Sequence, residues 1–168
     1  MIMGIDPSLV GTGVICLRDG EIERQQLIKT KPTDNHLDEL RRLLKIVDEI
    51  DFVDVEFAAM EGMAFMARNT TSLVQLSGLN YMIRARMYAY KIPFIIVAPM
   101  ALKKFITGKG NAPKEFMLME VYKRFGQEFR DNNLCDAYSL ARLAEAYLSA
   151  EQNMTVYQQE VIDKLKKV

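Results

Sequence analysis

One apolar segment limits the folds available to this chain more than any other feature. Residues 92–99, "IPFIIVAP", carry no polar side chain. A strand that is apolar on both faces is typical of a parallel sheet covered by helices on both sides. A strand pattern over 53–61 and a helix pattern over 69–90 come before it. This order predicts a β–α–β crossover that ends in a buried sheet position.

The remaining expected strands and helices extend this unit to an α/β domain. "RDG" at 18–20 predicts a hairpin between two early strands. The expected strands are 2–6, 12–18, 21–28, 53–61 and 92–99, and the expected helices are 35–50, 69–90, 100–108, 112–126, 132–150 and 154–167. The apolar stripe expected on the first helix consists of Leu37, Leu40, Leu43, Leu44 and Val47. We expect one domain over 1–168, a mixed five-stranded sheet flanked by helices on both faces, with 154–167 appended.

Charge is balanced overall but unevenly distributed. The chain has 22 Lys and Arg and 22 Asp and Glu. Residues 34–61 hold nine acidic and three basic side chains, whereas residues 84–130 hold ten basic and three acidic ones. Such asymmetry gives a neutral protein a basic face that suits nucleic acid, although two ordinary solvated faces explain it as well.

Other features concern the location of the protein. No apolar run is long enough to span a membrane, and no secretory signal is visible. The two cysteines, Cys16 and Cys135, lie far apart in the sequence, which favours buried, reduced thiols. We expect a cytoplasmic protein without a membrane partner.

Two expected strands end at an acidic residue that precedes a flexible turn. In "MGIDPSLVGTGV", residues 3–14, Asp6 ends the first strand, and Glu61 ends the strand at 53–61 just before a glycine. The carboxyl ends of neighbouring strands meet at the edge where α/β proteins bind ligands. Asp136 lies in the first turns of a helix whose small residues allow close packing on the sheet. Taken singly, a turn, solvation or the helix dipole explains each acid.

Together, the three carboxylates predict a metal site. Converging carboxylates repel unless a cation lies between them. Oxygen donors of this kind favour Mg²⁺ or Mn²⁺ over zinc. A pair of such ions is a general means of hydrolysing a phosphodiester.

Four segments carry a resemblance to a known family. They are "GIDPSLVGTGV", "AAMEGMAFMARN", "GKGNAPKEFM" and "DNNLCDAYSLARLA", in this order within residues 2–148. In them the chain resembles the RuvC-type Holliday junction resolvases of the ribonuclease H-like superfamily, and its shortness suggests the phage or viral branch. The resemblance implies an endonuclease that uses Mg²⁺, or alternatively Mn²⁺, and resolves four-way junctions and other branched DNA by paired nicks.

The resemblance also implies partners and site residues. It implies a homodimer, with 69–90 as an interface element, in the cytoplasm or in the host cytoplasm if phage-encoded. The family's metal-binding acids match Asp6, Glu61 and Asp136. Asn133 stands where the family has a fourth acid, three residues before Asp136 and on the same helix face. An amide oxygen can still bind a metal, while Asp131 is the alternative source of a fourth charge.

The remaining expected site residues contact DNA. Lys114 matches the family's basic helix start, where it would steady the scissile phosphate; a solvated lysine is the alternative. Phe65 is the candidate for an aromatic that enters the junction centre, and a core position is its alternative. The other expected DNA-binding residues are Arg68, Lys103, Lys104 and Lys109.

Two other functions remain open at this point. A non-catalytic branched-DNA-binding protein would keep the fold and lose the chemistry at Asn133. An actin-like or sugar-kinase-like ATPase also opens with an aspartate after a strand. That class has a duplicated domain, so this chain would be a fragment of one.

Overall fold

The computed structural model describes residues 1–33, 35–63, 70–149 and 154–167. The strands are β1 (Ile2–Asp6), β2 (Gly11–Arg18), β3 (Glu21–Lys29), β4 (Phe57–Glu61) and β5 (Phe94–Val97). The helices are α1 (His36–Glu49), α2 (Thr70–Ala89), α3 (Pro99–Thr107), α4 (Lys114–Phe125), α5 (Asn132–Leu148) and α6 (Val156–Leu165). Within the described ranges, no helix combines the length and apolarity needed to cross a membrane. Cys16 and Cys135 are free and buried, as predicted.

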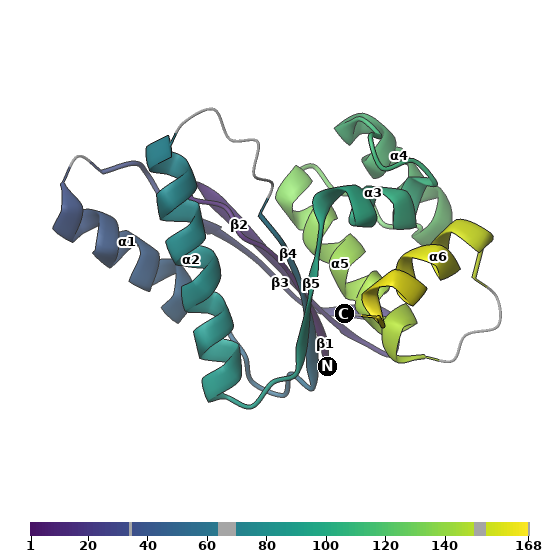
Figure 1. The fold of residues 1–168 in the computed structure, drawn as a ribbon, viewed down its shortest axis with the longest axis horizontal. Coiled ribbons are helices and arrows are strands. Elements are labelled where there is room, and N and C mark those ends of the chain that lie inside the picture. Colours follow the sequence, from purple (N-terminus) through teal and green to yellow (C-terminus); the bar gives the residue numbers. More distant parts are fainter. Residues whose placement is uncertain (34, 64–69, 150–153, 168) are drawn as a thin grey trace.

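The strands form one sheet in the order β3–β2–β1–β4–β5, seen nearly edge-on in Figure 1. β2 pairs antiparallel with both β1 and β3. β4 pairs parallel with both β1 and β5. The predicted mixed five-stranded sheet and its β–α–β crossover are therefore confirmed. The buried position predicted for the last strand was wrong: β5 pairs with β4 alone, lies at the edge of the sheet, and three of its four residues are only partly buried.

Helices cover both faces of the sheet (Figure 1). On one face, α1 and α2 pack on a core that includes Met3 and Ile5 of β1. On the other face, α5 packs on the sheet together with α3, α4 and α6, and Ile2 contacts this second core. Because side chains alternate along a strand, Ile2, Gly4 and Asp6 point toward α5.

The approach of α5 to β1 and β2 is close enough to require glycine. A Cβ atom added to Gly4 would lie 1.9 Å from the carbonyl oxygen of Ala137 and 2.5 Å from the nitrogen of Ala141. A Cβ atom on Gly13 would lie 2.3 Å from the carbonyl oxygen of Asn133. The small residues predicted to bring this helix near the sheet do so, backbone against backbone.

The strand predicted over 53–61 is shorter than expected, because β4 begins only at Phe57. Asp54 has a left-handed φ of 58°, which interrupts an extended chain. The terminal ammonium of Met1 donates to the Asp54 carbonyl at 2.7 Å and to the Glu56 carboxylate at 2.8 Å. Residues 53–56 thus form a turn that holds the start of β1.

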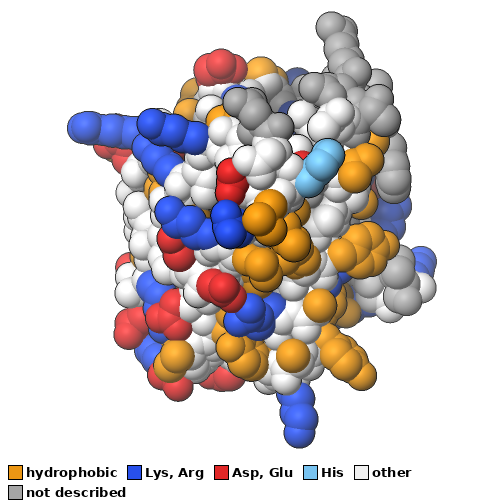
Figure 2. All heavy atoms as spheres, turned by 90° about the vertical axis from the view of Figure 1, so that its left-hand side faces the viewer, with side chains coloured by type: hydrophobic (Ala, Val, Ile, Leu, Met, Phe, Trp, Pro, Cys, Tyr) orange, Lys and Arg blue, Asp and Glu red, His pale blue; other side chains and the backbone are white. Residues whose placement is uncertain are grey.

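The apolar stripe predicted on the first helix was wrong for three of its five residues. Leu43 and Val47 are buried together with Ile46, whereas three leucines are exposed. The exposed ones are Leu37, Leu40 and Leu44, at 59, 50 and 41 %. The helix is rotated so that a second apolar stripe faces outward, and Figure 2 shows hydrophobic side chains gathered on this side of the molecule.

We expect Gly4→Ala to destabilise the fold by about 3 kcal/mol, because its methyl group meets helix backbone that no rotamer change can move away. Thermal or denaturant unfolding measures the loss. Gly78→Ala is the matched control: its Cβ would lie at an ordinary 3.7 Å from Leu43 Cδ1. Replacing a helical glycine there should raise stability by up to about 1 kcal/mol. Equal stabilities for Gly4→Ala and wild type would contradict the close packing.

Candidate active site

Asp6 and Glu61 end two neighbouring parallel strands. Ile5 of β1 pairs with Met60 of β4, so the residues that follow lie side by side at the carboxyl edge of the sheet. Both side chains lie on the α5 face, since Ala59, two residues before Glu61, belongs to the core beneath that helix. Asp6 is buried, and its side chain shares a hydrogen bond with that of Glu61. The predicted meeting of these two acids therefore occurs.

The start of α5 brings the third acid. Asp131 is the N-cap of this helix: its Oδ1 accepts from the backbone N–H of Asn133 at 2.9 Å and of Leu134 at 3.3 Å. The close packing of α5 on β1 carries Asp136 into the electrostatic neighbourhood of Asp6 and Glu61. The Asp131 carboxylate is engaged in capping the helix.

Burial raises the pKa values of all three acids, and repulsion by neighbouring acids adds to this at Asp6 and Glu61. Burial is the main cause that raises the pKa of Asp6 well above its ordinary range, followed by the charges of Glu61 and Asp136. Burial first, then the charge of Asp136, raises the pKa of Glu61 to about 7. Burial also raises the pKa of Asp136. The site therefore holds protons near neutral pH that a cation would displace.

Two of the predicted lysines face these acids. The charges of Lys103 on α3 and Lys114 at the first residue of α4 lower the pKa values of Glu61 and Asp136. The charge of Lys114 also lowers the pKa of Asp6. Positive charge at the start of a helix is unfavourable for the helix dipole. The acids provide a local electrostatic reason for Lys114 to lie there.

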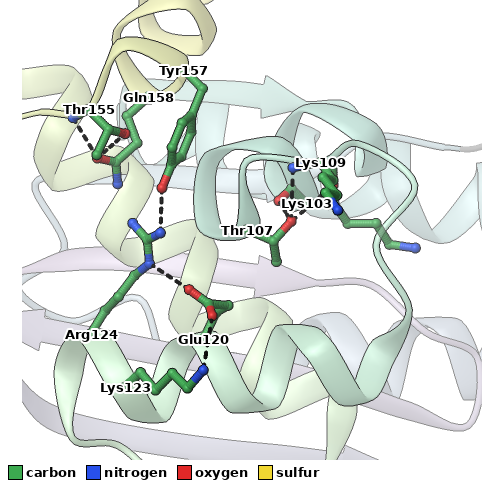
Figure 3. Close-up of polar contacts among 9 residues, drawn as sticks. All are labelled: Lys103, Thr107, Lys109, Glu120, Lys123, Arg124, Thr155, Tyr157 and Gln158. Carbon is green, nitrogen blue, oxygen red and sulfur yellow. Dashed lines mark hydrogen bonds and ion pairs between the residues drawn. The ribbon is translucent and has the colours of Figure 1, made fainter.

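The other two predicted lysines lie elsewhere. Lys104 forms an ion pair with Glu160 of α6 at 2.5 Å. Lys109 follows α3, where the Thr107 hydroxyl donates to the carbonyl oxygens of Lys103 and Lys109 (Figure 3). Their role toward DNA stays a prediction. Phe65 and Arg68 lie outside the described residues.

Asn133 is anchored to the sheet by its amide nitrogen. Nδ2 donates to the carbonyl oxygen of Gly11 at 2.6 Å, at the start of β2. This bond ties the first turn of α5 to the strand beside β1. It leaves Oδ1 as the side-chain atom free to act as a ligand, since an amide nitrogen is not a metal donor.

Asn80 belongs to the site and was not predicted. It lies fully buried in α2, and its Nδ2 donates to the backbone carbonyl of Glu61 at 3.2 Å. Among the described residues its Oδ1 has no hydrogen-bond partner. The signal in the sequence is a lone amide within the otherwise apolar stripe of the 69–90 helix. Asn80 holds the end of β4 where the catalytic candidate Glu61 projects.

The donor set suits a hard divalent cation by its chemistry. Asp6, Glu61 and Asp136 offer only oxygen atoms, and each is burdened by burial that a cation would relieve. Among the described residues, no three side chains of His, Cys, Asp or Glu lie close enough together to hold a metal ion. Asp6 and Glu61 instead bond to each other, which compensates their burial.

Comparison with known proteins decides the family. The model described as crossover junction endodeoxyribonuclease RuvC matches residues 2–143. This chain belongs to the RuvC family. The RuvC of Porphyromonas gingivalis is 31 % identical over 135 residues, which cover 76 % of this chain and 71 % of the relative. The RuvC of Synechococcus sp. strain CC9605 is 32 % identical over 152 residues, which cover 85 % and 96 %.

Solved RuvC structures share the fold. Thermus thermophilus RuvC in complex with a Holliday junction substrate matches with a TM-score of 0.65 and 22 % identity, over 83 % of this chain and 89 % of that chain. Thermus thermophilus RuvC also matches with a TM-score of 0.64 and 21 % identity, over 83 % and 90 %. The ribonuclease H-like fold expected for this RuvC chain is thereby confirmed.

We expect Asn133→Asp to lower the stability of the metal-free protein by about 1–3 kcal/mol, because a carboxylate cannot donate to the Gly11 carbonyl. Excess Mg²⁺ should restore more stability to this variant than to wild type, since a fourth carboxylate adds attraction for the cation. Thermal unfolding in chelator and in Mg²⁺ measures both effects.

Asn133→Ala is the control for that measurement. It should lose similar stability in chelator, because it also lacks the donor, and gain nothing extra from Mg²⁺. If Asn133→Asp unfolds like wild type under both conditions, Asn133 neither anchors α5 nor adjoins a cation.

Proposed function

We propose that this chain is a metal-dependent endodeoxyribonuclease that resolves four-way DNA junctions by paired nicks. The observation that carries the proposal is that Asp136 of α5 interacts electrostatically with Asp6 and Glu61 at the carboxyl edge of the sheet, in a RuvC-family chain. The relatives are named crossover junction endodeoxyribonucleases, and a structural neighbour is a complex with a Holliday junction. Both names support this reaction class and branched DNA as the substrate.

In this proposal the acids hold Mg²⁺, with Mn²⁺ as the alternative. When bound, the cations supply positive charge that stabilises the phosphate in the transition state and lower the pKa of the attacking water. Asp6, Glu61 and Asp136 would hold the cations in their deprotonated forms, and the amide oxygen of Asn133 would be a neutral and therefore weaker ligand. Lys114, beside the acids, attracts and orients the scissile phosphate.

Metal binding and proton release are linked at this site. The pKa of Glu61 of about 7 means that part of the population is protonated at neutral pH. Occupation by a cation requires the deprotonated form, so the affinity for metal rises with pH through this range. Asp6 and Glu61 therefore need no histidine to respond to pH near neutrality.

We further propose that the enzyme is a homodimer joined through an outward face of α1 and α2. The residues of this α1/α2 face are Leu37, Leu40, Leu44, Val74, Tyr81 and Tyr88, all exposed. Figure 2 shows their side of the molecule, with hydrophobic side chains gathered over these two helices. Contiguous exposed apolar patches of this kind mark interaction surfaces. Two copies supply the two active sites that paired nicks require.

We expect Asp6→Asn to abolish junction cleavage while junction binding persists. Loss of a metal ligand removes several kcal/mol of transition-state stabilisation, which corresponds to a rate loss on the order of 10²-fold or more. The neutral amide should also leave stability unchanged or higher, because Asp6 is buried with like charges. Cleavage of a labelled four-way junction in Mg²⁺, Mn²⁺ and chelator, with binding measured in parallel, gives the result.

The same assay separates the competing functions. Junction binding by wild type without cleavage in either metal would identify a non-catalytic DNA-binding protein. Wild-type rates for Asp6→Asn would place the chemistry elsewhere in the chain. Membership of the RuvC family argues against the ATPase alternative. The cytoplasmic location and the phage or viral origin stay predictions.

We expect the double variant Leu40→Glu and Tyr81→Glu to be a monomer at concentrations where wild type is a dimer. Each glutamate places a charge in a contact that buries apolar surface, which is costly without a partner. Sedimentation velocity distinguishes the two states. Met119→Glu, on an exposed position of α4, is the control and should remain dimeric. Monomeric wild type at tens of micromolar would contradict the interface.

A further inference from the structure

A second basic site lies away from the carboxylates, between α1 and the end of β3. It is a groove of about 610 Å³. Its lining residues are Val10, Lys29, Thr30, Lys31, Asp38, Arg41, Arg42 and Lys45. Five of the eight carry positive charge and one carries negative charge. Lys and Arg side chains also gather beside the hydrophobic patch in the upper left of Figure 2.

The single acid in the groove is already engaged. Asp38 forms an ion pair with Arg41 at 3.0 Å, and it belongs to the first turn of α1. Lys45 lies 3.6 Å from Glu49, in an exposed pair that screening weakens. Lys29 and Lys31 form no ion pair with any described residue and are exposed. The groove therefore keeps an excess of positive charge.

Arg42 is the unusual member of this group, because its charge is buried. It is only 8 % exposed. Its Nε donates to the Thr30 hydroxyl at 3.0 Å, and its Nη2 donates to the carbonyl oxygen of Leu9. Both acceptors are neutral, and no carboxylate of the described residues pairs with it. A buried cation with neutral partners is costly, and an anion in the groove would relieve that cost.

The arrangement on α1 separates this groove from the other surfaces of the helix. Asp38, Arg41, Arg42 and Lys45 follow an i, i+3, i+4, i+7 spacing and share one helix face. The buried stripe around Leu43 and the exposed leucines occupy the neighbouring faces. One short helix thus contributes to the core, to the α1/α2 face and to the groove.

The groove opens at the same edge of the sheet as the catalytic candidates. Asp6 pairs with Gly13 at the β1–β2 border, and Gly11 pairs with Lys29 at the β2–β3 border. Two strand spacings, roughly 10 Å, separate the line of β1 from that of β3. A nucleic acid strand seated at the carboxylates can continue along this edge toward Lys29 and Lys31.

We infer that this groove binds backbone phosphates of a DNA arm that leaves the active site on the α1 side. The inference rests on the proposed function for the nature of the ligand. Guanidinium and ammonium groups on exposed and buried positions together suit phosphodiester oxygens, with Arg42 as the fixed donor and the lysines as mobile ones. Contacts of this kind carry affinity without sequence preference.

The test uses the full chain and a charge-matched pair of variants. Lys29→Gln with Lys31→Gln removes two exposed charges and leaves the structural Arg42 in place. Arg18→Gln with Lys91→Gln removes two exposed charges at the opposite edge of the sheet. For each protein, binding to a four-way junction and to a plain duplex is measured from 50 to 200 mM salt. Junction cleavage by wild type in Mg²⁺ and Mn²⁺ and thermal unfolding with and without inorganic phosphate complete the set.

The inference predicts that only the Lys29/Lys31 variant changes. Its slope of log affinity against log salt should become shallower by up to about 1.8, at about 0.9 per lost phosphate contact. Its affinity at low salt should fall roughly tenfold. Wild type and the Arg18/Lys91 control should keep the same slope.

The other outcomes are distinct. If wild type cleaves the junction and both double variants keep its salt slope, the groove does not contact DNA and the proposed function stands. If wild type binds DNA without cleaving it, and only the Lys29/Lys31 variant has a shallower slope, the nuclease proposal fails and the groove stands. If inorganic phosphate stabilises wild type but not the Lys29/Lys31 variant, while the DNA slopes agree, the groove is a free-anion site and the inference is overturned.

Discussion

The contact of α5 with the backbone of β1 and β2 is the interaction on which the rest of this structure depends. Gly4 and Gly13 leave no side chain between helix and sheet, so the helix backbone lies directly against the strands. At this separation the charge of Asp136 raises the pKa of Asp6. The same contact places Asn133 where its amide bonds to Gly11. A residue with a side chain at either position would move Asp136 away from Asp6 and would also weaken the core.

Burying the three acids side by side costs folding stability. Burial raises the pKa values of three neighbouring acids, which means that their charged forms are disfavoured where they stand. The protein stabilises the arrangement with the Asp6–Glu61 hydrogen bond and with the charges of Lys103 and Lys114. Buried acids with perturbed pKa values, held in place although they cost stability, are typical of functional sites. It separates these acids from ordinary capping residues such as Asp131.

The sequence was sufficient for the fold and for the strand-end acids, because both leave local signals. The apolar segment at 92–99 indicated a strand, although β5 lies at the edge of the sheet rather than in the buried position that was predicted. Asp6 and Glu61 each stood before a turn. The sequence could not predict the position of residues that depends on how a helix is rotated or on what it contacts. Leucines at 37, 40 and 44 have the spacing of a core stripe, yet α1 turns them outward. The partners of Asn80 and Lys104 lie in other elements, 19 and 56 residues away.

The last helix extends the functional unit past the region that defines the family. The family match ends at residue 143, whereas α6 begins at Val156. This helix holds Lys104 through Glu160, and Tyr157 accepts a hydrogen bond from Arg124 of α4 (Figure 3). It therefore braces the two helices that carry Lys103 and Lys114. Substitutions in this segment, which lies outside the family match, would loosen the contacts that hold α3 and α4 without changing any of the four motifs.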